Sequence, residues 1–269
     1  MIKSPALVKY SLILIGLSYL GLIVITPLVN IFYQAFAEGI ASYWAGITTP
    51  EALHAIMITL LAVAIAVPLN TVFGILIAWV IARQQFWGKE LLVNILDLPL
   101  AISPIIAGLM LILLYSPTLG IFGKWLANAG IKVIFAFPSI VLAITFVTLP
   151  FVAKEVLPAL QAIGREEEEV ARTLGANSWQ IFWRITLPNI RWALLYGIIL
   201  CTARALGEFG AVSVVSGKII SQTNTLTLHI ERTYAEYQST AAFACATLLT
   251  LIAIVTLIAQ EILRQTGHK

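Results

Sequence analysis

The sequence has few charged residues for its length. Of its 269 residues, 11% are Asp, Glu, Lys or Arg and 60% are hydrophobic, whereas a soluble domain has about 25% charged residues. So little charge cannot cover a globule in water, which excludes an ordinary soluble domain. The net charge is +3, but the basic residues stand singly between apolar runs, so we expect no nucleic-acid partner. Lipid is therefore the expected solvent for most of the chain.

Cysteine and histidine are also scarce. Cys201 and Cys245 fall inside apolar runs, where a thiol packs as a small, weakly polar group. They predict neither a disulfide framework nor a metal site. His54, His229 and His268 have no cysteine or carboxylate at ligand spacing, so we expect no metal and no cofactor on this chain.

A phosphate-binding loop is missing as well. Such a loop needs Gly-x-x-x-x-Gly-Lys followed by Ser or Thr, because backbone N–H groups cradle the phosphates and the hydroxyl binds Mg²⁺. The three Gly-Lys pairs are followed instead by Glu90, Trp125 and Ile219. ATP and its Mg²⁺ must therefore bind to a partner, and we predict no catalytic residues in this chain.

Long apolar runs dominate what is present. A hydrocarbon core about 30 Å thick needs about 20 apolar helical residues. Prolines inside the runs, such as Pro68 and Pro104, predict kinked helices. We therefore predict an all-α fold, a single polytopic membrane domain over residues 1–269 with six transmembrane helices. The six runs lie near residues 11–36, 55–82, 91–115, 134–153, 192–215 and 240–262.

The basic residues between these runs predict the orientation. If the N-terminus is cytoplasmic, the loops on that side carry eleven Lys or Arg residues and the opposite loops carry four. The positive-inside rule then places both termini in the cytoplasm. A cleaved signal peptide ending near Ala35-Phe36-Ala37 is the alternative for the first run, although its apolar stretch exceeds the about 7–15 residues of a signal core.

The longest polar segment lies between the fourth and fifth runs, at residues 154–188. The four glutamates at 166–169 favour a helix start, where carboxylates interact with the positive end of the helix dipole. Gly175 offers a left-handed position that ends this helix. Asn177 or Ser178 can then cap a second short helix, which we expect Pro188 to terminate.

Two short helices with apolar side chains at a membrane surface predict a docking surface for another protein. An amphipathic hairpin resting on lipid headgroups is the alternative.

The spacing in this segment resembles the EAA motif of binding-protein-dependent ABC importer permeases. Its anchors are Glu169-Val170-Ala171, three residues, Gly175, nine residues, and Ile185-Thr186-Leu187-Pro188. The resemblance implies that the segment couples the chain to a cytoplasmic ATPase subunit. It also implies the type I, MetI-like permease fold, a second permease subunit, two ATPase copies and an extracytoplasmic binding protein. The implied coupling residues are Glu169, Ala171, Gly175, Ile185, Leu187 and Pro188.

Further segments resemble the CysW-type permease subunits of sulfate and thiosulfate importers. They are "DLPLAISPIIAGL" at 97–109, "ARALGEFGAVSVVSG" at 203–217, "NTLTLHIE" at 224–231 and "AAFACATLL" at 241–249. The resemblance implies ATP-driven alternating access for these oxyanions in a bacterial inner membrane, within a heterodimer with a CysT-like subunit. A CysT-type subunit or a molybdate or tungstate permease is the related alternative. Thr227 stands where this family usually has proline.

A charged pair lies inside the fifth run. Arg204 and Glu208 are four residues apart on one predicted helical face, and an intramembrane charge costs a few kcal/mol unless it is paired or faces a polar cavity. We predict that the pair faces the subunit interface. It either joins two subunits or takes part in gating and solute contact.

Four polar residues follow at the outer end of this run, namely Ser213, Ser216, Asn224 and Thr225. A hydrated dianion needs hydrogen-bond donors along its path, so they are candidates for an outer gate. Simple capping and turning of the chain is the alternative.

Two other classes of protein are weaker hypotheses. An intramembrane serine protease would need a serine and a histidine at similar depth, together with a Gly-x-Ser-x-Gly context. An ion-driven secondary transporter would show inverted repeats and more intramembrane carboxylates than Glu208, the clear one in this sequence.

Overall fold

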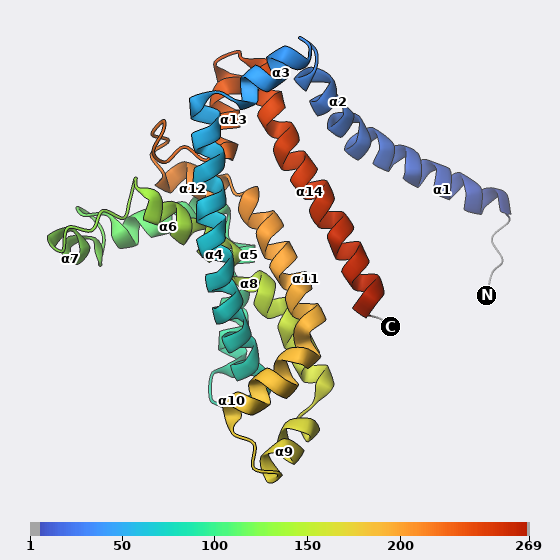
Figure 1. Cartoon of the computed structure of the whole chain (residues 1–269), viewed down its shortest axis with the longest axis vertical. Coiled ribbons are helices and arrows are strands. Elements are labelled where there is room, and N and C mark those ends of the chain that lie inside the picture. The colour runs from blue at the N-terminus through green and yellow to red at the C-terminus, as the bar shows by residue number, and fades with distance from the viewer. Residues whose placement is uncertain (1–5, 268–269) are drawn as a thin grey trace.

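Four long helices run along the long axis of the molecule (Figure 1). The computed structural model describes residues 6–267, so that Lys3, His268 and Lys269 lie outside the described part. One end of the molecule carries the short helices α9 and α10, and the opposite end carries α3 and α13. The long helices are α4 (Pro50–Arg83), α8 (Phe137–Ile163), α11 (Leu187–Leu206) and α14 (Ser239–Gly267).

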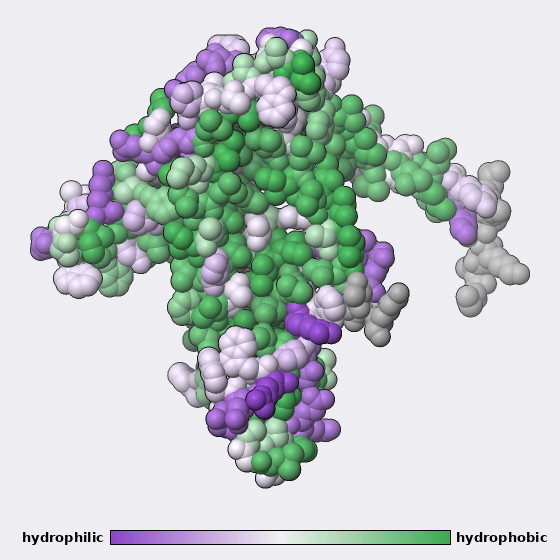
Figure 2. All heavy atoms as spheres, viewed as in Figure 1, coloured by the Kyte–Doolittle hydropathy of each residue, from purple (hydrophilic) through white to green (hydrophobic). Residues whose placement is uncertain are grey.

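Within residues 6–267, five helical stretches are long and apolar enough to cross a membrane, or six if one bent pair counts as a single span. The prediction of an all-α bundle with six spans is confirmed in this sense. Apolar residues cover the middle of the molecule, and polar residues gather at its two ends (Figure 2). The five stretches are Val8–Ala35, Pro50–Arg83, Phe137–Ile163, Ser178–Leu206 and Ser239–Gln265.

The third predicted span is the bent pair. Helix α5 (Lys89–Ala101) and helix α6 (Pro104–Tyr115) meet at 110°. The break falls at Ile102 and Ser103, which have extended backbone angles. The ring of Pro104 disfavours helical geometry in the residue before it, so the helix stops there. Pro99 lies inside α5 without breaking it.

The boundaries predicted around the polar segment were wrong. Helix α8 continues to Ile163, ten residues beyond the predicted end of the fourth span. Pro188 terminates nothing, because α10 (Ser178–Ile181), the π-helical turn η2 (Phe182–Thr186) and α11 form one helical stretch. The wider π turn just before Pro188 lets the helix continue past a residue without an N–H. The turn η1 (Gly21–Ile25) stands in the same place before Pro27.

The fifth predicted span is also divided. Helix α11 ends at Leu206, and the short helix α12 (Gly210–Val215) begins after a break at residues 207–209. A turn region then leads to α13 (Leu226–Ala235). Residues 192–215 are therefore two helices instead of one.

Small residues allow the long helices to approach closely. A Cβ on Gly74 of α4 would lie 2.9 Å from Val152 of α8, and one on Gly197 of α11 would lie 3.1 Å from the same residue. Val152 is fully buried between them. Close contact through small residues is the usual way in which helices associate in lipid, where the hydrophobic effect does not drive them together.

The N-terminal helices form an arm that points away from the bundle (Figure 1). It consists of α1 (Ala6–Leu20), η1 and α2 (Thr26–Ala35), and none of the residues in its most apolar window is buried. Only its far end, α2 with the following α3 (Ile40–Ile47), packs against α14. On the other side, α6 leads to the short α7 (Gly123–Asn128).

Candidate coupling segment and pathway residues

The predicted first helix of the polar segment is α9 (Glu166–Thr173), with four glutamates in its first turn. Gly175 follows at φ +85°. Its N–H donates to the carbonyl of Arg172 (3.1 Å), and the N–H of Ala176 donates to that of Ala171 (3.0 Å). This is the Schellman pattern that ends a helix at a left-handed glycine, so the local prediction for Gly175 is confirmed.

Asn177 begins the next helix as predicted. Its side chain accepts from the N–H of Gln180 (2.8 Å), and the side chain of Gln180 accepts from the N–H of Asn177 (3.0 Å). This reciprocal pair is a capping box, which satisfies donors that the first turn leaves free. The two caps leave the chain only Ala176 between Gly175 and Asn177, so the turn from α9 to α10 is tight.

An open recess of about 440 Å³ lies between α9 and α10. Three of the predicted coupling residues, Ala171, Gly175 and Ile185, line it. Leu174 at its edge is 83% exposed, which is a large apolar side chain left in the open at a polar end of the molecule. Val170, four residues earlier, is 59% exposed as well, and neighbouring exposed apolar side chains of this kind are typical of a surface that another protein covers.

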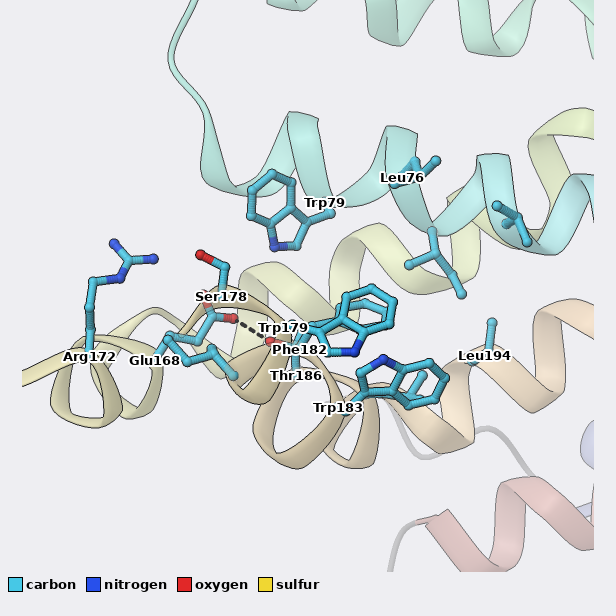
Figure 3. A pocket seen from close by; sticks show the side chains of 14 residues that line it. Leu76, Trp79, Glu168, Arg172, Ser178, Trp179, Phe182, Trp183, Thr186 and Leu194 are labelled. Atoms are coloured by element: carbon cyan, nitrogen blue, oxygen red, sulfur yellow. Dashed lines mark hydrogen bonds between the residues drawn. The ribbon is translucent and has the colours of Figure 1, made fainter. Parts of the chain in front are cut away.

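The other three predicted coupling residues lie outside this recess. Glu169 and Pro188 are exposed. Leu187 lines a separate apolar pocket of about 610 Å³ between α4 and the helical stretch from α10 to α11. In this pocket Trp79 on α4 faces Trp179, Phe182 and Trp183 (Figure 3).

Glu168 forms a buried ion pair with Arg83, and the sequence analysis did not select it. One of its carboxylate oxygens accepts from Arg83 Nη2 (2.9 Å) and from the hydroxyl of Thr186 (3.1 Å). The four consecutive glutamates gave no means of telling which one turns inward. The feature of the sequence that could have pointed to Glu168 was Arg83, a charged residue at the inner end of the second predicted span.

The predicted pair of Arg204 and Glu208 forms, with 2.7 Å between Nη1 and Oε2. Glu208, however, lies beyond the end of α11, so the two residues do not share a helical face. Its side chain is fully buried within this chain, whereas that of Arg204 is 35% exposed. The prediction that both face a subunit interface is therefore wrong for Glu208.

Glu208 shapes the break between α11 and α12. Its Oε1 accepts from the N–H of Ala211 (2.9 Å), which lies in the first turn of α12. Its backbone carbonyl accepts from the hydroxyl of Thr227 (3.0 Å). A proline at position 227 could not make this bond, so this departure from the family pattern has a structural consequence.

The four polar residues at the outer end of the fifth run divide into two groups. Ser213, Ser216 and Thr225 bond to nearby groups: Ser213 donates to the Gly210 carbonyl (2.8 Å), Ser216 accepts from the Lys218 N–H (3.1 Å), and Thr225 pairs with the Thr227 hydroxyl (3.2 Å). These contacts are those of chain turns. Asn224 is 3% exposed and its amide nitrogen has no hydrogen-bond partner in the described chain. Among the four, Asn224 retains the strongest case for a pathway role.

A buried polar contact in the core was missed. The amide of Asn70 on α4 donates to the hydroxyl of Thr148 on α8 (2.7 Å), and the thiol of Cys201 on α11 lies 3.8 Å from the Thr148 carbonyl. Cys201, interpreted from sequence as a packing residue, therefore also takes part in polar contacts.

A further ion pair corrects the count of carboxylates in the helices. Asp97 on α5 pairs with Lys154 on α8 at 2.8 Å. Glu208 is therefore not the single carboxylate of the candidate spans.

The opposite end of the molecule holds a polar cavity of about 300 Å³ beside α13, lined by His229, Arg232, Glu51 and Glu236 among others. Arg232 Nη2 lies 3.3 Å from His229 Nδ1. Arginine can only donate, so Nδ1 accepts and the imidazole is neutral. Burial, and to a lesser degree the charge of Arg232, hold the pKa of His229 below its usual value.

Several apolar helices long enough to cross a membrane, with a capped polar segment between two of them, define a polytopic membrane protein. Residues 70–266 match the family model described as "binding-protein-dependent transport system inner membrane component". The chain belongs to this family of importer permeases. The alternatives of an intramembrane protease and a secondary transporter are thereby excluded.

Two relatives and one solved structure illustrate the similarity. The sulfate transport system permease protein CysW of Synechocystis sp. is 52% identical over 97% of this chain and 95% of its own length. The permease protein CysT of Escherichia coli K12 is 39% identical over 94% of this chain and 93% of its own length. A bacterial alginate ABC transporter, in complex with its periplasmic protein, has a subunit with the same fold, with a TM-score of 0.78 at 19% identity over 94% of this chain and 92% of that one.

Proposed function

We propose that this chain is the CysW-type permease subunit of an ATP-driven importer of sulfate or thiosulfate. The observation that carries the proposal is the 52% identity to a CysW protein over nearly the whole of both chains. The identity to a CysT protein is lower, at 39%, which favours the CysW subunit over its CysT-type partner.

The structure supports the need for a second permease subunit. The arm from α1 to α2 has no buried residue in its apolar window, and it extends away from its own bundle (Figure 1). Lipid alone can surround the helices of this arm. The bent pair of α5 and α6, which meet at 110°, is different, because the helix ends at the bend need protein or water around them. A CysT-like subunit facing this chain would enclose those ends along a shared pathway.

The α9–α10 end lies in the cytoplasm in this proposal, because the positive-inside rule places basic residues there. Two copies of an ATPase bind ATP and Mg²⁺, and one of them covers the recess lined by Ala171, Gly175 and Ile185. An extracytoplasmic protein delivers the oxyanion to the α3–α13 end. This chain hydrolyses no ATP. It offers a wet path that opens to one side of the inner membrane at a time.

The test is uptake of radiolabelled sulfate by a bacterial strain that lacks its own sulfate permease subunits. The strain receives this chain together with a CysT-type subunit, the ATPase and the sulfate-binding protein. We expect uptake that requires all four proteins and that unlabelled thiosulfate inhibits. Uptake of molybdate but not sulfate would instead identify a molybdate permease, and uptake without the ATPase would contradict the proposal.

A further inference from the structure

Helix α9 is connected to the bundle by a buried charge pair. The Glu168 Oε1 atom accepts from Arg83 Nε (3.2 Å) and Arg83 Nη2 (2.9 Å), at the end of α4. The same oxygen accepts from the hydroxyl of Thr186 in η2 (3.1 Å), a bond drawn in Figure 3. The side chains of Arg83 and Glu168 are only 6% and 12% exposed. One carboxylate oxygen thus joins three separate helical elements.

Arg83 extends the connection to a fourth element. Its Nη1 donates to the carbonyl of Leu160 (3.0 Å), in the last turn of α8. Its own carbonyl accepts from the guanidinium of Arg165, just before α9. We call Arg83, Leu160, Glu168 and Thr186 the Arg83 junction. A guanidinium presents several donors in one rigid plane, so it holds its acceptors in a defined geometry that an ammonium group would not.

The backbone just before α9 does not provide the same rigidity. Gly164 before the helix has φ +73° and Gly175 after it has φ +85°, and an added Cβ at either position would have no neighbour within 4 Å. Glycine permits many backbone conformations. Without the junction, α9 and the capped turn that joins it to α10 would be connected to α8 through the backbone of Gly164. The side chains therefore determine whether α9 moves with the spans or independently of them.

The neighbouring glutamates show the contrast. Glu166 and Glu169 are exposed. Glu167 accepts from the exposed amide of Asn189 (2.6 Å). Asn189 lies on α11, the helix that follows the segment in the chain. Of the four glutamates, Glu168 is the one that pairs with Arg83 of α4. A buried ion pair has to be well oriented to offset the desolvation of its charges.

We propose that Arg83 and Glu168 are positioning residues for energy coupling, which rests on the function proposed above. The Arg83 junction makes α9, the inner ends of α4 and α8, and the start of the helix at residues 178–206 one rigid unit. A displacement of α9 by the ATPase then moves these spans together. If the junction is broken, α9 still follows the ATPase, but the spans do not follow α9.

The test compares Glu168→Gln with Glu166→Gln, an exposed glutamate on the same helix, in the complete transporter reconstituted into liposomes. Sulfate uptake and ATP hydrolysis stimulated by the binding protein are measured together. We expect E168Q to raise the ATP hydrolysed per sulfate imported by about tenfold, within the range of typical coupling effects, with ATP hydrolysis nearly retained. E166Q should leave this ratio unchanged.

Two more variants keep the test informative if E168Q assembles poorly. Thr186→Val removes one bond without leaving a charge unpaired, and should raise the ratio by about twofold to threefold, as expected for one modest hydrogen bond. The double variant R83Q/E168Q should be no more uncoupled than E168Q, because both changes break one unit.

An unchanged ratio in E168Q and T186V would overturn the proposal, as would losses of uptake and ATP hydrolysis in strict parallel with loss of bound ATPase. These results differ from failure of the proposed function, in which the unaltered complex would show no ATP-dependent sulfate uptake.

Discussion

The two buried glutamates, Glu168 and Glu208, have different kinds of partner. Glu168 accepts from Arg83 and Thr186, which are 85 and 18 residues away in the chain. Glu208 pairs with Arg204 and with the N–H of Ala211, both within four residues. The contacts of Glu168 fix distant helices to each other, and those of Glu208 stabilise the break between α11 and α12.

The comparison shows that the same chemical group can join distant helices or shape one stretch of chain, depending on where its partners come from. Long-range partners would transmit a displacement between elements, as proposed for Glu168. Local partners determine where a helix stops. The predictions below test this distinction, and they begin with the largest expected effect.

The first prediction concerns the local pair. Arg204→Gln leaves the charge of Glu208 buried without a counterion, which should lower stability by about 3–5 kcal/mol. Glu208→Gln removes the buried charge itself and should cost less. The melting temperature in detergent can be followed with a thiol-reactive dye, because Cys201 and Cys245 are both buried and free. Equal losses in the two variants would show that the charge of Glu208 does not matter.

The second prediction concerns the end of α9. Gly175→Val forces a β-branched residue into a left-handed conformation at φ +85°, which costs about 1–2 kcal/mol. We expect the protein to insert into the membrane but to lose sulfate uptake, because the recess between α9 and α10 changes shape. Gly175→Asn is the matched control, since asparagine tolerates this conformation, and it should retain uptake. Normal uptake by G175V would rule out the coupling role of the segment.

The third prediction compares two helix starts. Asn177→Ala removes the capping box of α10 and should cost about 1 kcal/mol. Thr225→Ala, at the start of α13, should cost clearly less, because the Thr225 side chain caps no backbone N–H there. Melting temperatures of the two variants decide the matter. A larger loss in T225A would mean that its contact with Thr227 carries more weight than the cap of α10.

The fourth and smallest effect is a dependence on pH at the α3–α13 end. Burial and Arg232 lower the pKa of His229 in the folded state, so the unfolded state binds more protons as the pH falls. Stability should therefore be constant above about pH 6.5 and decline below it. His229→Gln should remove this part of the decline in a series of melting curves. An unaltered decline in H229Q would assign it to other groups.

Much of the fold followed from local patterns. The apolar runs predicted the spans, because lipid requires about 20 apolar residues to cross it. Gly175 and Asn177 predicted the end of α9 and the start of α10, since caps depend on residues only a few positions apart. The EAA-like spacing predicted the family, which the comparisons confirmed.

Other features depended on contacts that no local pattern contains. Pro188 predicted a helix end, but a π turn just before it carried the helix onward. The break after Leu206 was missed because residues 192–215 are mostly apolar, and because Arg204 and Glu208, which flank the break, have the spacing of one continuous helix. The roles of the predicted coupling and pathway residues in transport stay predictions.

The sequence by itself determined that this chain is a membrane protein and that it is helical. It also determined that a capped polar segment with the spacing of the EAA motif lies between two of its spans. These properties come from composition and from residues a few positions apart. Only the tertiary structure decided which of four consecutive glutamates turns inward and that Glu208 is enclosed by its own chain. The reason is physical: a buried charge is placed by partners from other helices, and the sequence does not say which helices meet.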